Sequence, residues 1–132
     1  MNVNFVAVVV AGLVPMVVGS LWYGPLFGKQ WMKLAGKKAS DLQNNAGSSY
    51  LLTGLLWLLI SYALAHFVQY TFADTWLEGA ITAFWLWTGF VFAPQLIHSL
   101  FDGSSKKLLA INAGYTLVAL LGMGIILVVL PN

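Results

Sequence analysis

Four stretches of the chain contain no Asp, Glu, Lys or Arg and are long enough to cross a bilayer as helices. They cover residues 3–24, 50–72, 79–101 and 108–130. A helix needs about 20 predominantly apolar residues to span the hydrocarbon core. The pattern therefore predicts an all-α integral membrane protein with four transmembrane helices.

Composition supports the same fold class. The chain has 132 residues, of which 60% are hydrophobic and 8% are charged, whereas about a quarter of the residues of a soluble domain are charged. Because little sequence lies outside the four stretches, we expect a single transmembrane domain over residues 1–132. The first stretch has no basic residue before it and is too long for the apolar region of a signal peptide, so we interpret it as a retained helix.

The lysines predict the orientation of the spans. All six basic residues are lysines, and they fall between spans one and two or between spans three and four: Lys29, Lys33, Lys37, Lys38, Lys106 and Lys107. The turn between spans two and three carries only Asp74 and Glu78. Because positive residues favour the cytoplasmic side, we expect both termini outside and a multi-pass protein of the cell inner (cytoplasmic) membrane.

Residues 15–24 (PMVVGSLWYG) resemble residues 94–103 (PQLIHSLFDG) at the same end of spans one and three. The match predicts two helical hairpins of the same orientation, related by a pseudo-twofold axis along the membrane normal. A chance match is the alternative, because apolar sequence of low complexity matches itself easily.

The end of the first span carries a stop signal. Gly24 and Gly103 occupy the place where a helix ends on a left-handed glycine, and Pro25 has no N–H with which to continue a helix. We therefore expect the first helix to end near Gly24. Ser48 or Ser49 is expected to cap the second span.

Aromatic and basic residues follow this stop and predict an interfacial anchor. Aromatic rings sit at the headgroup level of a bilayer, and lysines on a short surface helix face anionic lipid. The predicted anchor consists of Trp22, Tyr23, Trp31, Lys29 and Lys33.

The same residues resemble a known family. Residues 22–31 (WYGPLFGKQW), together with the Gly89-Phe90 pair and residues 109–115 (LAINAGY), are similar to the bacterial membrane family called domain of unknown function 1761. The resemblance implies a small four-span protein over nearly the whole chain. It implies no activity and names no catalytic residue.

Polar residues within the spans form a first candidate site. Gln95 and His98 share one face of the third span, and Asn112 lies at a similar depth in the fourth. We expect Gln95 or His98 to bond the fourth span or a water shared with Asn112, in a cluster completed by Tyr23 and Thr53. A ligand site or proton relay open to the cytoplasm is one interpretation, and a structural network between helices is the other.

A second polar cluster, Tyr62, His66 and Gln69, lies in the outer half of the second span. At about 1.5 Å per residue, His66 and His98 are roughly 20 Å apart in depth, so they cannot share a metal ion. With two histidines and no cysteine, the sequence predicts no transition-metal site and no cofactor.

Small residues predict close helix packing. They recur every four residues on spans one and four, at Ala7, Ala11, Pro15 and Gly19 and at Ala110 and Gly114. Such faces let helix backbones approach closely, either within the chain or between subunits. Pro15 and Pro94 are expected to bend their spans.

Two functional classes remain. The first is a protein that binds or transports a small molecule near Gln95 and His98, as a homo-oligomer because four short spans enclose little volume. The second is a structural or accessory protein that packs against lipid or another membrane protein. The sequence carries no carboxylate inside a span and no nucleic-acid-binding pattern, so catalysis is disfavoured and nucleic acid is not an expected partner.

Overall fold

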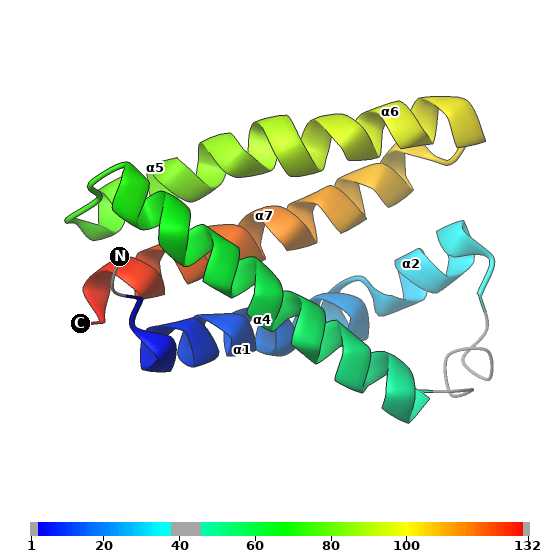
Figure 1. Cartoon of the computed structure of the whole chain (residues 1–132). Helices are drawn as coiled ribbons and strands as arrows, with labels where there is room; N and C mark the ends of the chain where they lie inside the picture. The colour runs from blue at the N-terminus through cyan, green and yellow to red at the C-terminus, as the bar shows by residue number, and fades with distance from the viewer. Residues whose placement is uncertain (1–2, 38–45, 131–132) are drawn as a thin grey trace.

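The computed structural model describes residues 3–37 and 46–130, and every regular element within these ranges is helical (Figure 1). The α-helices are α1 (Phe5–Leu21), α2 (Gly28–Ala35), α4 (Ala46–Tyr70), α5 (Trp76–Trp87), α6 (Ala93–Asp102) and α7 (Lys106–Val129). Two five-residue π-helical turns complete the list: η1 (Trp22–Leu26) continues α1, and η2 (Thr88–Phe92) joins α5 to α6.

Four helical runs have the length and apolar composition of membrane spans: Phe5–Leu26, Gly47–Tyr70, Trp76–Asp102 and Lys106–Val129. The prediction of four apolar helices is therefore confirmed. The helix α4 already contains Ser48 and Ser49, so the prediction that one of them caps it is wrong.

Helix α7 lies between the other helices. It packs against α5, α1 and α4, and α1 also packs against α4. In Figure 1 the two termini and the α4–α5 turn lie at one end, which we call the terminal end. Helix α2 and the α6–α7 turn lie at the other end, which we call the lysine end because every described lysine lies in α2, just after α2 or at the start of α7.

Small residues set the close approaches between the helices. A Cβ on Gly79 of α5 would collide with the backbone oxygen of Gly124 of α7, so these two helices touch at the level of their backbones. On α1, the buried residues Ala7, Ala11 and Pro15 face the interior of this single chain. The predicted small-residue face of α1 thus serves packing within the chain, whereas Ala110 is exposed.

The first span ends at Leu26, which confirms the prediction of an end near Gly24 but not its geometry. The positive-φ glycines of the described chain are Gly36 and Gly103, so the prediction of a left-handed Gly24 is wrong and that of a left-handed Gly103 is confirmed. The Phe27 N–H donates to the Trp22 carbonyl at 2.8 Å, and this five-residue loop carries the helix past Pro25, which has no N–H. The backbone leaves helical geometry at Phe27, and the predicted short helix around Trp31 follows as α2.

The two copies of the predicted repeat differ in their backbones. Pro15 lies inside α1, and a π-helical turn begins at Trp22, within the last residues of the 15–24 copy. Pro94 instead lies in the first turn of α6, after the π-helical turn η2, and α6 then ends on the left-handed Gly103. The sequence match therefore does not extend to the position of the irregular turn.

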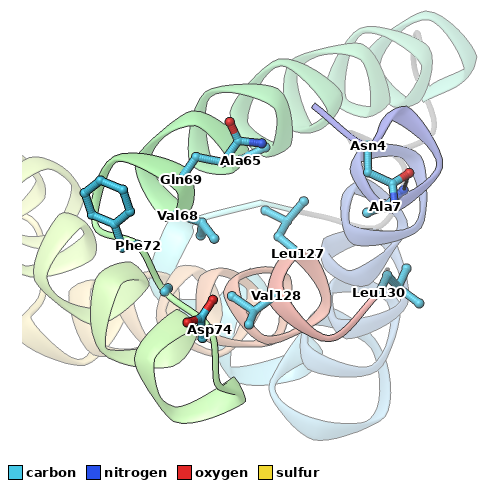
Figure 2. Close-up of a pocket in the computed structure, with 11 residues that line it drawn as sticks. Asn4, Ala7, Ala65, Val68, Gln69, Phe72, Asp74, Leu127, Val128 and Leu130 are labelled. Atoms are coloured by element: carbon cyan, nitrogen blue, oxygen red, sulfur yellow. Dashed lines mark hydrogen bonds between the residues drawn. The ribbon is translucent and has the colours of Figure 1, made fainter. Parts of the chain in front are cut away.

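The α4–α5 turn borders a cavity at the terminal end. Phe72 in this turn is the one non-glycine residue with a positive φ (54°) in the described part of the chain. The cavity has a volume of about 330 Å³ and lies between the ends of α1, α4 and α7. Figure 2 shows Gln69 and Phe72 on one side of it and Asn4 and Leu130 on the other.

Candidate functional site at the junction of two motifs

The π-helical turn η1 is joined to α7 through Trp22. The Trp22 indole N–H donates to the Ile111 carbonyl at 2.9 Å. The ring also lies against Gly114, where a Cβ would come within 3.0 Å of it. A glycine one turn along α7 thus makes room for the indole, and residues 22–31 meet residues 109–115 at this point.

Tyr23 makes the second link. Its hydroxyl donates to Asn112 Oδ1 at 2.6 Å, across 89 positions of sequence. Tyr115, three residues along α7, donates its own hydroxyl to the Pro15 carbonyl at 2.8 Å. The two motifs are therefore bonded to each other by side chains that are half-buried between α1 and α7.

Aromatic rings extend this junction to α2 and α4. The Tyr23 ring meets the edges of Tyr115 and Trp31 at centroid distances of 5.2 and 5.6 Å, and Tyr115 meets Trp57 of α4 at 5.9 Å. Edge-to-face pairs at these distances stabilise a cluster beyond simple burial. Thr53 lies with Tyr23, Trp57 and Tyr115 along a groove of about 600 Å³ between α1 and α4.

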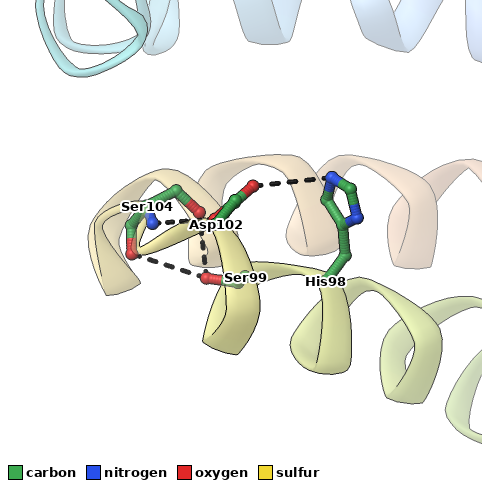
Figure 3. Close-up of polar contacts among 4 residues, drawn as sticks. All are labelled: His98, Ser99, Asp102 and Ser104. Atoms are coloured by element: carbon green, nitrogen blue, oxygen red, sulfur yellow. Dashed lines mark hydrogen bonds and ion pairs between the residues drawn. The ribbon is translucent and has the colours of Figure 1, made fainter.

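A second groove, of about 400 Å³, lies on the other side of Asn112, between α6 and α7. Gln95 and His98 line it together with Asn112. His98 Nε2 lies 3.5 Å from Asp102 Oδ2 on its own helix, and its side chain is 83% exposed. Figure 3 shows the His98–Asp102 pair and Ser104, whose N–H donates to Asp102 at 2.8 Å. The α6–α7 turn thus holds the carboxylate at the mouth of the groove.

Gln95 differs from its neighbours in the groove. Its Oε1 atom is buried and has no hydrogen-bond partner among the residues that the structure describes. A buried acceptor without a donor costs about 1–3 kcal/mol. A molecule that donated a hydrogen bond to Gln95 Oε1 would therefore be favoured at this position.

The structure divides the five residues of the first predicted cluster. Gln95, His98 and Asn112 border the α6–α7 groove, and Tyr23 and Thr53 border the α1–α4 groove. The Tyr23–Asn112 hydrogen bond connects the two sides. Among the described residues, the expected bond from His98 to the last span is replaced by its contact with Asp102 on its own helix.

The second predicted cluster remains on α4. Tyr62 meets the edge of the His66 ring at 4.7 Å and stacks on Phe5 at 6.1 Å. Gln69, one turn beyond His66, lines the cavity at the terminal end. The cluster is thus an aromatic contact plus one wall residue of a cavity.

The residues predicted as an interfacial anchor also divide into two groups. Trp22 and Tyr23 direct their N–H and O–H groups to α7; the sequence analysis placed Tyr23 in a cluster with Asn112 but assigned no such role to Trp22. Lys29 and Lys33 are exposed on α2, and Trp31 packs against Tyr23. The anchor prediction concerns a bilayer and stays a prediction for α2.

Two residues that join the helices in this region were not found from the sequence. Tyr115 follows Asn112 by three residues and so shares its helical face, a spacing that would have revealed it. Trp87 of α5 donates to Thr116 Oγ1 at 3.0 Å and to the Ala113 carbonyl at 3.2 Å, and no sequence pattern pointed to this pair. In the described ranges no three His, Asp or Glu residues lie close enough together to hold a metal ion.

Comparison with known proteins gives one match. No curated protein and no solved structure matches the chain. The model of the family described as "Protein of unknown function (DUF1761)" matches residues 6–128, a range that contains both motifs of the junction. With nearly the whole chain matched, the protein belongs to the DUF1761 family.

Proposed function

We propose that this protein is a multi-pass protein of the bacterial cytoplasmic membrane that binds a small polar molecule in the groove between α6 and α7. The observation that carries the proposal is the buried Oε1 atom of Gln95, which has no donor within the described chain and borders the same groove as Asn112. Polar groups buried in a membrane span are costly and mark functional sites by default.

The lining of the groove supports a ligand with donors. Gln95 offers an acceptor inside it, while Asp102 offers a carboxylate at its mouth. A molecule with hydroxyl or amine groups matches both, because a carboxylate accepts but does not donate. Asn112 is held in place by Tyr23, so one wall of the groove is preorganised.

The arrangement of charges supports a cytoplasmic entrance. The groove lies near the α6–α7 turn, which Lys106 and Lys107 follow as the first residues of α7. Under the positive-inside rule this end is cytoplasmic and the termini are outside, which matches two hairpins of the same orientation. Single cysteines at Lys37 and Asp74, probed on intact cells with an impermeant thiol reagent, test this. Labelling of Lys37→Cys without Asp74→Cys would reverse the orientation.

We further propose that the protein acts as a homo-oligomer. The groove is open on one side, and a second copy would close it, as transport of the ligand would require. Cross-linking of the protein in native membranes tests the assembly. If the protein is strictly monomeric, the proposal of ligand binding stands and the proposal of transport falls.

The test of binding uses Gln95→Leu. Purified protein in detergent is screened by thermal shift against amino acids, polyols and nucleosides, and each stabilising compound is titrated into the variant. We expect Gln95→Leu to match or exceed the wild-type melting temperature, since the unpaired acceptor is gone, and to lose the ligand-induced shift. Gln30→Leu, an exposed amide on α2, is the matched control and should keep that shift.

The alternative function is that of a structural or accessory membrane protein. The junction favours it, because Trp22, Tyr23 and Tyr115 are satisfied by partners within the chain. This alternative holds if no compound shifts the melting temperature and if cells that carry Gln95→Leu behave as cells with the wild-type protein do.

A further inference from the structure

The turn at the end of α4 keeps a strained residue where a glycine is usual. The Phe72 N–H donates to the Gln69 carbonyl, and the Ala73 N–H donates to the Val68 carbonyl at 3.1 Å. This pattern closes a helix around a left-handed residue, which is normally glycine because a Cβ is unfavourable there. Phe72 occupies that position with φ at 54°. Strain of this kind persists where the local geometry serves a site.

The strained turn brings an aromatic residue and a carboxylate to the rim of one cavity. Phe72 is 84% exposed and borders the terminal-end cavity, as does Asp74 two residues later (Figure 2). Asn4 and Gln69 add amide groups to the wall, and the remaining wall is apolar. An aromatic face, an anionic oxygen and amide carbonyls are the groups that recognise an organic cation.

The charges at this end agree with that chemistry. All five described lysines lie at the lysine end. Glu78 is occupied in the cap of α5, where its Oε1 accepts from the N–H groups of Asp74 and Thr75. Asp74 is therefore the carboxylate that faces the cavity, and no described lysine competes for it.

We propose that the terminal-end cavity is a binding site for a small organic ammonium group, with Asp74 as its counter-ion and Phe72 as its aromatic wall. A volume of about 330 Å³ is at the lower limit for ligand pockets, so the group is the size of choline or smaller. The site stands apart from the α6–α7 groove, at the other end of the bundle, and does not depend on the function proposed for that groove.

Calorimetric titration of the full chain in dodecyl maltoside micelles tests the site. The probe is choline, and its uncharged isostere 3,3-dimethylbutan-1-ol is the comparison. We expect choline to bind roughly tenfold or more tightly than the isostere, and Asp74→Asn to remove that preference, because choline alone carries the positive charge that the Asp74 carboxylate attracts. Asp74→Glu should retain most of the affinity.

Substitutions of Phe72 separate strain from recognition. Phe72→Leu should weaken choline binding about two- to fivefold through loss of the ring face. The exposed Phe101 lies at the opposite end, so Phe101→Leu is the matched control and should change nothing. Phe72→Gly should raise the melting temperature, since glycine takes a positive φ without strain, and should weaken choline binding at the same time.

Two lipid compositions identify the source of the ammonium group. Choline affinity is compared in nanodiscs of phosphatidylethanolamine and in nanodiscs of phosphatidylglycerol. Weaker choline binding in phosphatidylethanolamine would show that its headgroup competes and would assign the site to a lipid headgroup. Equal choline affinity in the two kinds of nanodisc would assign the site to a free solute. Either result supports an ammonium site. Equal binding of choline and its isostere, no binding of choline to the folded protein, or unchanged affinity in Asp74→Asn would overturn the proposal.

Discussion

The polar residues of η1 and those of α6 lie at the same end of the bundle and border neighbouring grooves, yet they are used differently. Tyr23 is half-buried and bonded to Asn112, while His98 is 83% exposed and paired only within its own helix. In these two regions, contact with α7 separates the roles of the polar side chains. Tyr23 reaches α7 and holds helices together, whereas His98, whose ion pair lies within α6, lines a groove.

Helix packing explains why the two regions differ. At η1, Gly114 and Gly19 allow the rings of Trp22 and Tyr115 to enter the space between α1 and α7. On the other side, α6 touches α7 much less extensively than α5 does. The loose contact beyond η2 leaves the α6–α7 groove open, and Gln95 remains without a partner inside it among the described residues.

The largest effect should come from filling the junction. Gly114→Leu would place a side chain where the Trp22 ring lies, and we expect a loss of about 1–3 kcal/mol or failure to fold, as overpacking does in tight cores. Ala110→Leu, one turn earlier on the same helix and exposed, is the control and should be neutral in a detergent melt. Equal tolerance of both variants would show that the junction is not tightly packed.

An intermediate effect is expected from breaking the Tyr23–Asn112 hydrogen bond. Tyr23→Phe and Asn112→Leu should each lower stability by about 1 kcal/mol. A double-mutant cycle isolates the pair, and we expect a coupling of about 0.5–1.5 kcal/mol. Tyr50→Phe removes an exposed hydroxyl at the same end and serves as the reference. Additive losses in the cycle would mean that the two side chains act separately.

The smallest effect is expected at the mouth of the groove. His98→Ala removes an exposed ring whose partner, Asp102, lies on the same helix, and such contacts are weakened by solvent. We therefore expect no measurable change in melting temperature, in place of the loss that an interhelical bond would have implied. A destabilisation as large as that of Tyr23→Phe would erase the contrast between the two regions.

Local features of the chain were predicted well and their partners were not. The four apolar helices, the short helix around Trp31 and the left-handed Gly103 all followed from residues within a few positions of one another. The end of the first span near Gly24 was predicted, but its geometry was not, because a π-helical turn carries the helix past Pro25 with a hydrogen bond that closes a longer loop. Nothing in the two copies of the repeat indicated that one π-helical turn would include the end of the first copy and that the other would precede the second copy.

By itself, the sequence determined that the chain forms four apolar helices and that the basic residues fall in two of the connections. These properties depend on local composition, because a helix satisfies its own backbone hydrogen bonds. Only the tertiary structure decided that Tyr23 bonds Asn112, that Gly114 receives Trp22 and that Gln95 lacks a donor within the described chain. Periodicity shows which residues share a face of one helix. It cannot show which neighbour that face meets, because lipid is as apolar as the side chains of a helix interface and leaves no hydrophobic pattern to distinguish them.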